Sequence, residues 1–187
     1  MIRVLVGGVV GGIVMFFWGF VSHSLLKISE SSVRNIPAEP VVTTAMKLAI
    51  NQPGFYYFPG MDHSRTPTPE ERQAWEDKFR RGPTGVLVIH PQGGEFSMVR
   101  NLALEFLSNL LAALIVAAVV SQMAGGFAIQ AGAAAGFGLF SWLSISASYG
   151  IWYGFPGDFS QAEAIDQVVG WLLAGLGIAA ITSRRSQ

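Results

Sequence analysis

The stretch between Glu105 and Asp158 carries no charged residue over about fifty positions. A helix needs about 20 predominantly apolar residues to cross the hydrocarbon core of a bilayer. The stretch is therefore long enough to complete one crossing and hold another, with a tight turn between them. We place these crossings at Leu102–Val120, within a helix that begins at Met98, and at Phe127–Tyr149, with the turn at Ser121–Gly126.

Two further apolar segments flank this block. The first is Val4–Leu26, bounded by Arg3 and Lys27, and the last is Ile165–Thr182, preceded by a short loop at Asp158–Glu163. The first run is longer than the core of a signal peptide, about 7–15 residues, so we expect a retained anchor. The composition, 51% hydrophobic and 13% charged, agrees with a membrane protein.

We therefore predict an all-α membrane protein, a bundle of four transmembrane helices with a small α+β extramembrane insertion between the first and second helices. The expected parts are residues 1–27 (first span), 28–97 (insertion) and 98–187 (remaining spans).

The insertion contains signals for two helices and two strands. Pro40 precedes a helix expected at Val41–Asn51, and the capping box Thr68–Glu71 begins a helix that reaches Arg80. The expected strands are Phe55–Phe58 and Val86–His90. A unit this small is not expected to be stable alone, so we interpret it as a lid that lies on the membrane bundle.

Basic residues near the span ends predict the orientation. Arg3, Arg184 and Arg185 have no acidic neighbours, which favours cytoplasmic termini in a cytoplasmic (inner) membrane. The insertion then becomes a periplasmic loop. Its own cations do not alter this prediction, because segments longer than about 60 residues largely escape the positive-inside rule.

Small residues mark the faces through which the helices are expected to pack. In lipid such residues let helices approach closely. One expected face on the first span consists of Gly8, Gly12, Gly19 and His23, and one on the last span consists of Asp166, Gly170, Ala174 and Gly177.

Polar side chains gather in the outer third of every span. Ionisable groups within spans are costly and usually face protein or water. We therefore predict an outward-facing polar cup that could bind a ligand. Its lining would be His23, Glu105, Asn109, Ser144 and Asp166. The alternative is helix capping and interhelical hydrogen bonding, since carboxylates stabilise helix N-termini and serines bond to preceding carbonyls.

Two cofactors would suit the cup. His23, Glu105 and Asp166 form a ligand set for a divalent metal, to which His63 or His90 could add. Alternatively, Gly19, one turn before His23, would leave room for a tetrapyrrole whose metal binds the imidazole.

Other functions have less support. The chain has no cysteine, which excludes thiolate chemistry, and no net charge, which gives no argument for a nucleic-acid partner. No serine lies in a nucleophile elbow, so we expect a non-catalytic protein. We predict an accessory or scaffolding role in a larger complex, with lipid and other membrane subunits or a second copy as partners. A ligand-, metal- or tetrapyrrole-binding protein is the alternative.

Overall fold

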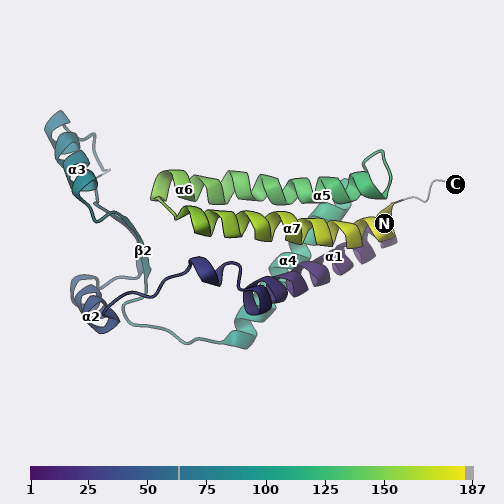
Figure 1. Cartoon of the computed structure of the whole chain (residues 1–187), viewed down its shortest axis with the longest axis horizontal. Helices are drawn as coiled ribbons and strands as arrows, with labels where there is room; N and C mark the ends of the chain where they lie inside the picture. Colours follow the sequence, from purple (N-terminus) through teal and green to yellow (C-terminus); the bar gives the residue numbers. More distant parts are fainter. Residues whose placement is uncertain (63, 184–187) are drawn as a thin grey trace. The chain divides into compact units, whose positions relative to one another are not determined.

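The computed structural model of the chain describes residues 1–62 and 64–183. It has four helices long and apolar enough to span a membrane, as the sequence predicts (Figure 1). The first span is α1 (Ile2–Phe20) continued by the π-helical turn η1 (Val21–Leu26), and the second is α4 (Met98–Val120). The third is α5 (Phe127–Ser141), continued by the π-helical η3 (Trp142–Ser146) and α6 (Ala147–Tyr153), and the fourth is α7 (Gly157–Thr182).

The chain divides into two compact units. One is Met1–Arg34 with Ser97–Gln187, and the other is Asn35–Phe96. The short helix η2 (Glu30–Ser32) therefore belongs with the spans, and it contacts α7. Its residue Ser32 is buried.

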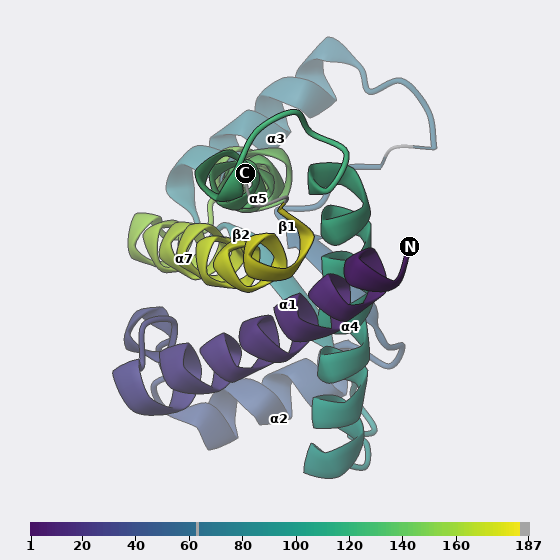
Figure 2. The same ribbon diagram turned by 90° about the vertical axis from the view of Figure 1, so that its right-hand side faces the viewer.

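The helices pack in the order α4, α1, α7, α5. The extensive interfaces are α4 with α1, α1 with α7, and α7 with α5, whereas α4 makes few contacts with α5 or α7. Figure 2 shows α1 crossing α4, and α5 running beside α7. Because α4 and α5 form the two ends of this row, each keeps a wide face free of its neighbours.

Glycines allow α1 to lie between two helices. Gly8 and Gly12 are buried against Leu114 and Leu110 of α4, and Gly11 is buried against Ile178 of α7. This confirms Gly8 and Gly12 as packing positions. The prediction for Gly19 was wrong, because no described atom lies within 4 Å of where its Cβ would be.

Close packing and hydrogen bonds join α5 to α7. A Cβ on Gly138 would collide with the carbonyl of Gln167, and one on Gly175 would collide with Ala134. Near the same place the Ser141 hydroxyl lies 3.0 Å from Gln167 Oε1.

Two further hydrogen bonds join this pair of spans. Thr182 donates its hydroxyl to Gln130 Oε1 at 2.7 Å, and the Trp142 indole donates to the Ser160 carbonyl at 2.8 Å. Such interhelical hydrogen bonds between spans contribute about 0.6 kcal/mol each on average.

The fourth span begins earlier than expected. Asp158–Glu163 was predicted to be a loop, and this was wrong, because α7 is continuous from Gly157. Pro156 is its N-cap, and Asp158 in the first turn complements the positive end of the helix dipole. These polar residues extend the helix rather than break it.

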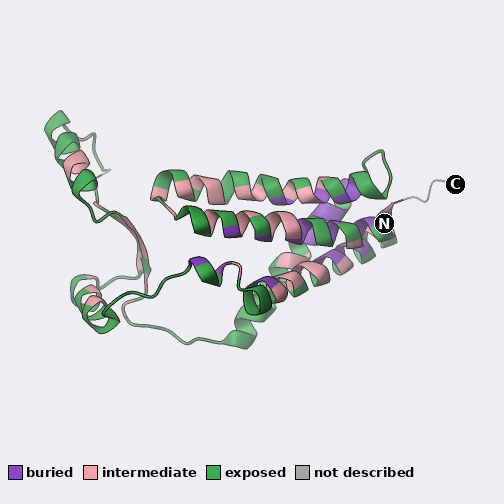
Figure 3. Cartoon of the chain, in the orientation of Figure 1, coloured by how far each residue is buried: buried purple, intermediate pink, exposed green. Residues whose placement is uncertain are grey.

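The tightly packed core lies toward one end of the four helices. Figure 3 shows buried positions concentrated in the halves of α1 and α7 that are nearest to the chain termini. The core is made of small and aliphatic side chains around one tryptophan: Ala113, Val116, Ala117, Val120, Ala134, Trp171, Ala174 and Ile178. The opposite end, where α1 gives way to η1, is looser and richer in polar groups.

The insertion contains the four elements that the sequence predicts, with slightly different bounds. They are α2 (Glu39–Ala49), β1 (Gly54–Phe58), α3 (Pro69–Arg81) and β2 (Gly85–Ile89), with β1 and β2 antiparallel and Tyr56 opposite Leu87. The capping box at Thr68 and Glu71 is confirmed. None of the described residues between 35 and 96 is buried, as expected for so thin a unit.

Candidate functional site

A break in helical geometry positions His23. The last turn of the first span, η1, is π-helical, and it ends at Lys27, which has left-handed backbone dihedrals (φ 52°). π-helical turns inside helices are frequent at functional sites. Here the turn sends the chain back on itself, so that Ser29 and Glu30 return to the neighbourhood of His23.

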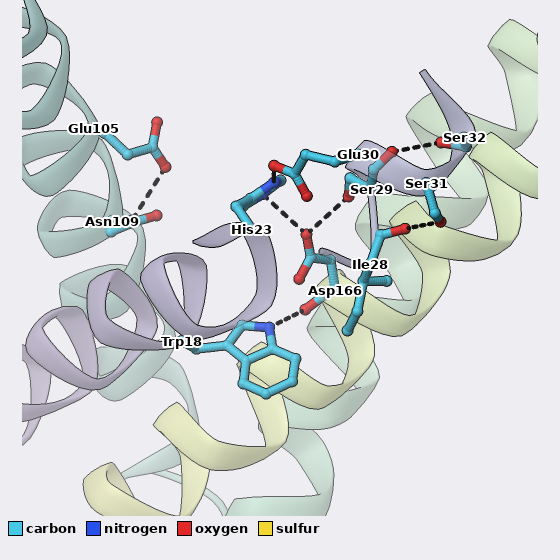
Figure 4. A network of polar contacts seen from close by, with 10 residues as sticks. All are labelled: Trp18, His23, Ile28, Ser29, Glu30, Ser31, Ser32, Glu105, Asn109 and Asp166. Atoms are coloured by element: carbon cyan, nitrogen blue, oxygen red, sulfur yellow. Dashed lines mark hydrogen bonds and ion pairs between the residues drawn. The ribbon is translucent and has the colours of Figure 1, made fainter. Parts of the chain in front are cut away.

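His23 lies between two carboxylates (Figure 4). Its Nδ1 is 3.2 Å from Glu30 Oε1, and its Nε2 is 3.2 Å from Asp166 Oδ2. The imidazole thus connects the segment that leaves the first span to the fourth span. About half of the His23 and Glu30 side chains is exposed, whereas only 12% of the Asp166 side chain is.

Asp166 is the buried anchor of this group. Its Oδ2 also accepts a hydrogen bond from the Ser29 hydroxyl at 3.4 Å, and its backbone carbonyl accepts one from the Trp18 indole at 3.1 Å. The second carboxylate oxygen, Oδ1, is buried and has no hydrogen-bond partner among the described residues. The Ser22 hydroxyl is likewise buried, with no hydrogen-bond partner among the described residues.

A third carboxylate adds to the negative charge here. Glu163 precedes Asp166 by three residues on α7, and it interacts electrostatically with both Asp166 and His23. We call His23, Glu30, Glu163 and Asp166 the histidine–carboxylate cluster. The imidazole thus contacts two carboxylates directly, and a third lies one turn before Asp166 on the same helix.

The other residues predicted for the cup lie elsewhere. Asn109 donates to Glu105 at 3.1 Å within α4, and Ser144 donates to the Phe140 carbonyl at 2.8 Å within its own span. The Ser144 contact is the kind that the alternative interpretation expected, whereas the Asn109–Glu105 contact is a side-chain pair four residues apart on one helix. Of the five predicted residues, His23 and Asp166 contact each other across two spans, and Glu105 and Asn109 contact each other within one.

The described residues do not bring together the three expected metal ligands, His23, Glu105 and Asp166. No group of three or more His, Asp or Glu side chains among them could hold a metal ion. His90 belongs to the other compact unit, and His63 lies outside the described residues. A tetrapyrrole at His23 fits poorly too, because both ring nitrogens already face carboxylates, although Gly19 does leave open space.

No protein-family model, curated protein or solved structure matches this chain.

Sequence reasoning missed Ser29, Glu30, Glu163 and Trp18 as members of the site. Glu163 had a usable signal, because it precedes Asp166 by three positions and would share its face if the helix began earlier. Ser29 and Glu30 had none, since their place depends on the left-handed turn at Lys27, a conformation uncommon outside glycine.

Proposed function

We propose that the protein is a non-catalytic scaffolding subunit of a membrane complex, and that it docks a further transmembrane helix on the free face of α5. The observation that carries this proposal is an exposed glycine pair on that face. Gly132 and Gly136 are one helical turn apart, and no described atom lies within 4 Å of where either Cβ would be.

This pair contrasts with the glycines that pack inside the unit. Gly8, Gly12, Gly138 and Gly175 are each covered so closely by a neighbouring helix that a Cβ would collide with it. Glycine costs a helix interior about 1 kcal/mol relative to alanine. At Gly132 and Gly136 no contact within the described chain offsets that cost, whereas a docked helix would.

The surface beside the pair has the form that helix docking needs. A hollow of about 310 Å³ is lined by Ala133, Gly136, Phe137 and Phe140. Its lining is almost wholly apolar, and two glycines spaced four residues apart in an apolar helix are the usual signature of a dimerisation face.

The occupant we propose is α5 of a second copy of this chain. A Gly-xxx-Gly notch is self-complementary, so two copies related by a twofold axis can bury the same surface on each other. The lining carries no charged side chain that would select an unlike partner. The dimer would then present its remaining faces, including α4, to other subunits.

We further infer that both termini are cytoplasmic and that the insertion lies outside the cytoplasmic membrane. The support is the position of Arg3, Arg184 and Arg185 in the sequence, beside the first and last spans; Arg184 and Arg185 lie outside the described residues. The chain has no cysteine, so single cysteines report the topology cleanly. A membrane-impermeant thiol reagent should label Gln92→Cys but not Met123→Cys in intact cells, and the reverse result would invert the orientation.

Native mass determination in mild detergent tests the dimer. We expect the wild-type chain to be a dimer and the double variant Gly132→Leu/Gly136→Leu to be a monomer. The control is Gly19→Leu, which adds the same bulk at another open glycine and should remain dimeric. A monomeric wild type, or a dimer unaffected by the double variant, would refute the α5 interface. A complex with a different protein that the double variant abolishes would refute the second-copy assignment alone.

A further inference from the structure

The histidine–carboxylate cluster has a definite proton requirement, which follows from the two close contacts of the His23 ring. An ionised carboxylate only accepts hydrogen bonds, and a neutral imidazole donates from one nitrogen alone. Both nitrogens of His23 lie 3.2 Å from carboxylate oxygens, those of Glu30 and Asp166. A ring nitrogen this close to a carboxylate oxygen is attracted to it only if a proton lies between them, so the two contacts together need two protons.

The protons can be distributed in two ways with the same total. Either the ring is an imidazolium between two carboxylates, or a neutral ring donates to one carboxylate and accepts from the protonated form of the other. In both cases the three groups together carry one negative charge. If one proton leaves, a ring nitrogen with a lone pair faces a carboxylate oxygen, and that contact becomes repulsive.

The contact that opens is the one to Glu30. Asp166 is buried, and one of its oxygens has no hydrogen-bond partner among the described residues, so losing the ring N–H that faces its other oxygen would be the costlier change. The Glu30 side chain is 48% exposed and can turn to water. The one remaining ring proton then stays on Nε2 of His23, the nitrogen that faces Asp166.

We propose that His23 is a proton-operated latch, which holds residues 28–34 against α7 when its extra proton is present and releases them when that proton is lost. The latch is closed at low pH and open at high pH. Its effect goes beyond scaffolding, because it makes the conformation of the chain leaving the first span depend on pH.

Residues 28–34 have other contacts, since Ser29 and Ser32 are buried and η2 contacts α7, but these contacts do not depend on the proton of His23. The Ser29 hydroxyl reaches Asp166 at 3.4 Å, and the Arg34–Asp158 ion pair at 3.0 Å is exposed. Exposed ion pairs contribute little, about 0–1 kcal/mol.

Besides Glu30 and Asp166, charged groups lie on three elements that contain or adjoin the turn of His23. Glu163 on α7 interacts with it electrostatically, Lys27 ends its own turn, and Glu105 lies on α4, which packs along α1. Glu105 is hydrogen-bonded to Asn109. Of these, Glu163 needs its own control.

The test measures the position of the segment in the full-length protein, reconstituted in nanodiscs. Spin labels are attached at Val33→Cys, which is exposed on the segment, and at Leu176→Cys, which is exposed on α7. Distances between them are recorded by electron paramagnetic resonance at about pH 5 and about pH 8, which bracket the titration of histidine. We expect one narrow distance distribution at the lower pH, and a broad, longer component at the higher pH.

Substitutions in the cluster separate a proton requirement from simple packing. His23→Ala should give the broad distribution at both pH values. Glu30→Gln should give the narrow one at both, because an amide can donate to a ring nitrogen as well as accept from one. Glu163→Gln and the distant His90→Gln should respond to pH as the wild type does.

The proposal is overturned if the wild-type distribution is the same at both pH values. It is also overturned if Glu30→Gln responds to pH as the wild type does, a comparison that remains decisive even if His23→Ala fails to fold. A response abolished by His90→Gln would assign the effect to the insertion instead.

Discussion

Trp18 donates its indole N–H to the backbone carbonyl of Asp166 over 3.1 Å, and the indole ring lies where a Cβ on Gly170 would be. This contact fixes how far α7 can slide along α1. Because Asp166 also meets His23, the same residue joins the helix interface to the histidine–carboxylate cluster. The position of the buried carboxylate is therefore set by packing, and not only by its charge partners.

Replacing Trp18 with Phe should weaken the α1–α7 interface. The change removes one hydrogen bond but keeps most of the ring, so we expect a loss of about 0.5–1.5 kcal/mol in unfolding free energy. The measurement is reversible unfolding in mixed micelles. Trp152→Phe is the control, because that side chain is 73% exposed, and its effect should stay within about 0.5 kcal/mol. Equal losses in the two variants would contradict the assignment.

Gly12→Ala should separate α1 from α4. A Cβ at Gly12 would lie 2.8 Å from Leu110 Cα, and backbone atoms cannot yield as a flexible side chain can. We expect a cost of about 1–3 kcal/mol, the usual range for overpacking. Thermal unfolding in one detergent measures it against Gly19→Ala. That control should be neutral or stabilising, because its Cβ meets open space and alanine favours the helix by about 1 kcal/mol.

The helices could be predicted from the sequence because their signals are local. The charge-free stretch after Glu105 predicted the second and third spans. The capping-box pattern Thr68-Pro69-Glu70-Glu71 predicted where α3 begins. The π-helical turns had no such signal, since they change the face on which later residues lie without changing composition. Glycine spacing was informative but ambiguous: Gly12 packs against α4, and Gly19 packs against nothing described.

The site was predictable only in part, for a related reason. His23 and Asp166 were expected to line one cup because each lies on a small-residue face and toward the outer side of the membrane. Glu105 was assigned to the same cup by depth alone, but depth does not fix the direction in which a side chain points. Its pairing with Asn109, four residues later, is the contact that helical geometry offers first.

Two serines of the third span should behave differently when replaced. The Ser141 hydroxyl contacts the Gly138 carbonyl of its own span and also Gln167 of α7. Ser141→Ala removes the second contact, which joins two spans, and we expect this to cost about 0.6 kcal/mol, the average for such bonds in membranes. Ser144→Ala should cost almost nothing, because that hydroxyl bonds to carbonyls of its own span. Unfolding of both variants under identical conditions decides between them. A larger loss for Ser144→Ala would instead support its predicted role in the cup.

Acid should loosen the start of α3 in the insertion. The pKa of Glu71 lies below its ordinary value, chiefly because its carboxylate pairs with Arg65 and also accepts the backbone N–H of Thr68. The folded state therefore binds the proton less readily than the unfolded state. The stability that Glu71 contributes is complete above the unfolded pKa, and it is lost as the pH falls through the lowered folded value.

Hydrogen exchange of the amides of Thr68 and Glu71, corrected for intrinsic rates, measures this loss. We expect protection to fall on acidification in the wild type. In Glu71→Gln the fall should be much smaller, since glutamine can still complete the capping box but does not titrate. Glu76→Gln is the control within the same helix. Its ion pair with Arg80 is remote from the first turn, so it should lose protection at Thr68 and Glu71 as the wild type does. An unchanged acid response in Glu71→Gln would show that another carboxylate causes the loss of protection. The first to examine would be the adjacent Glu70, because hydrogen bonds at this N-terminus also lower its pKa.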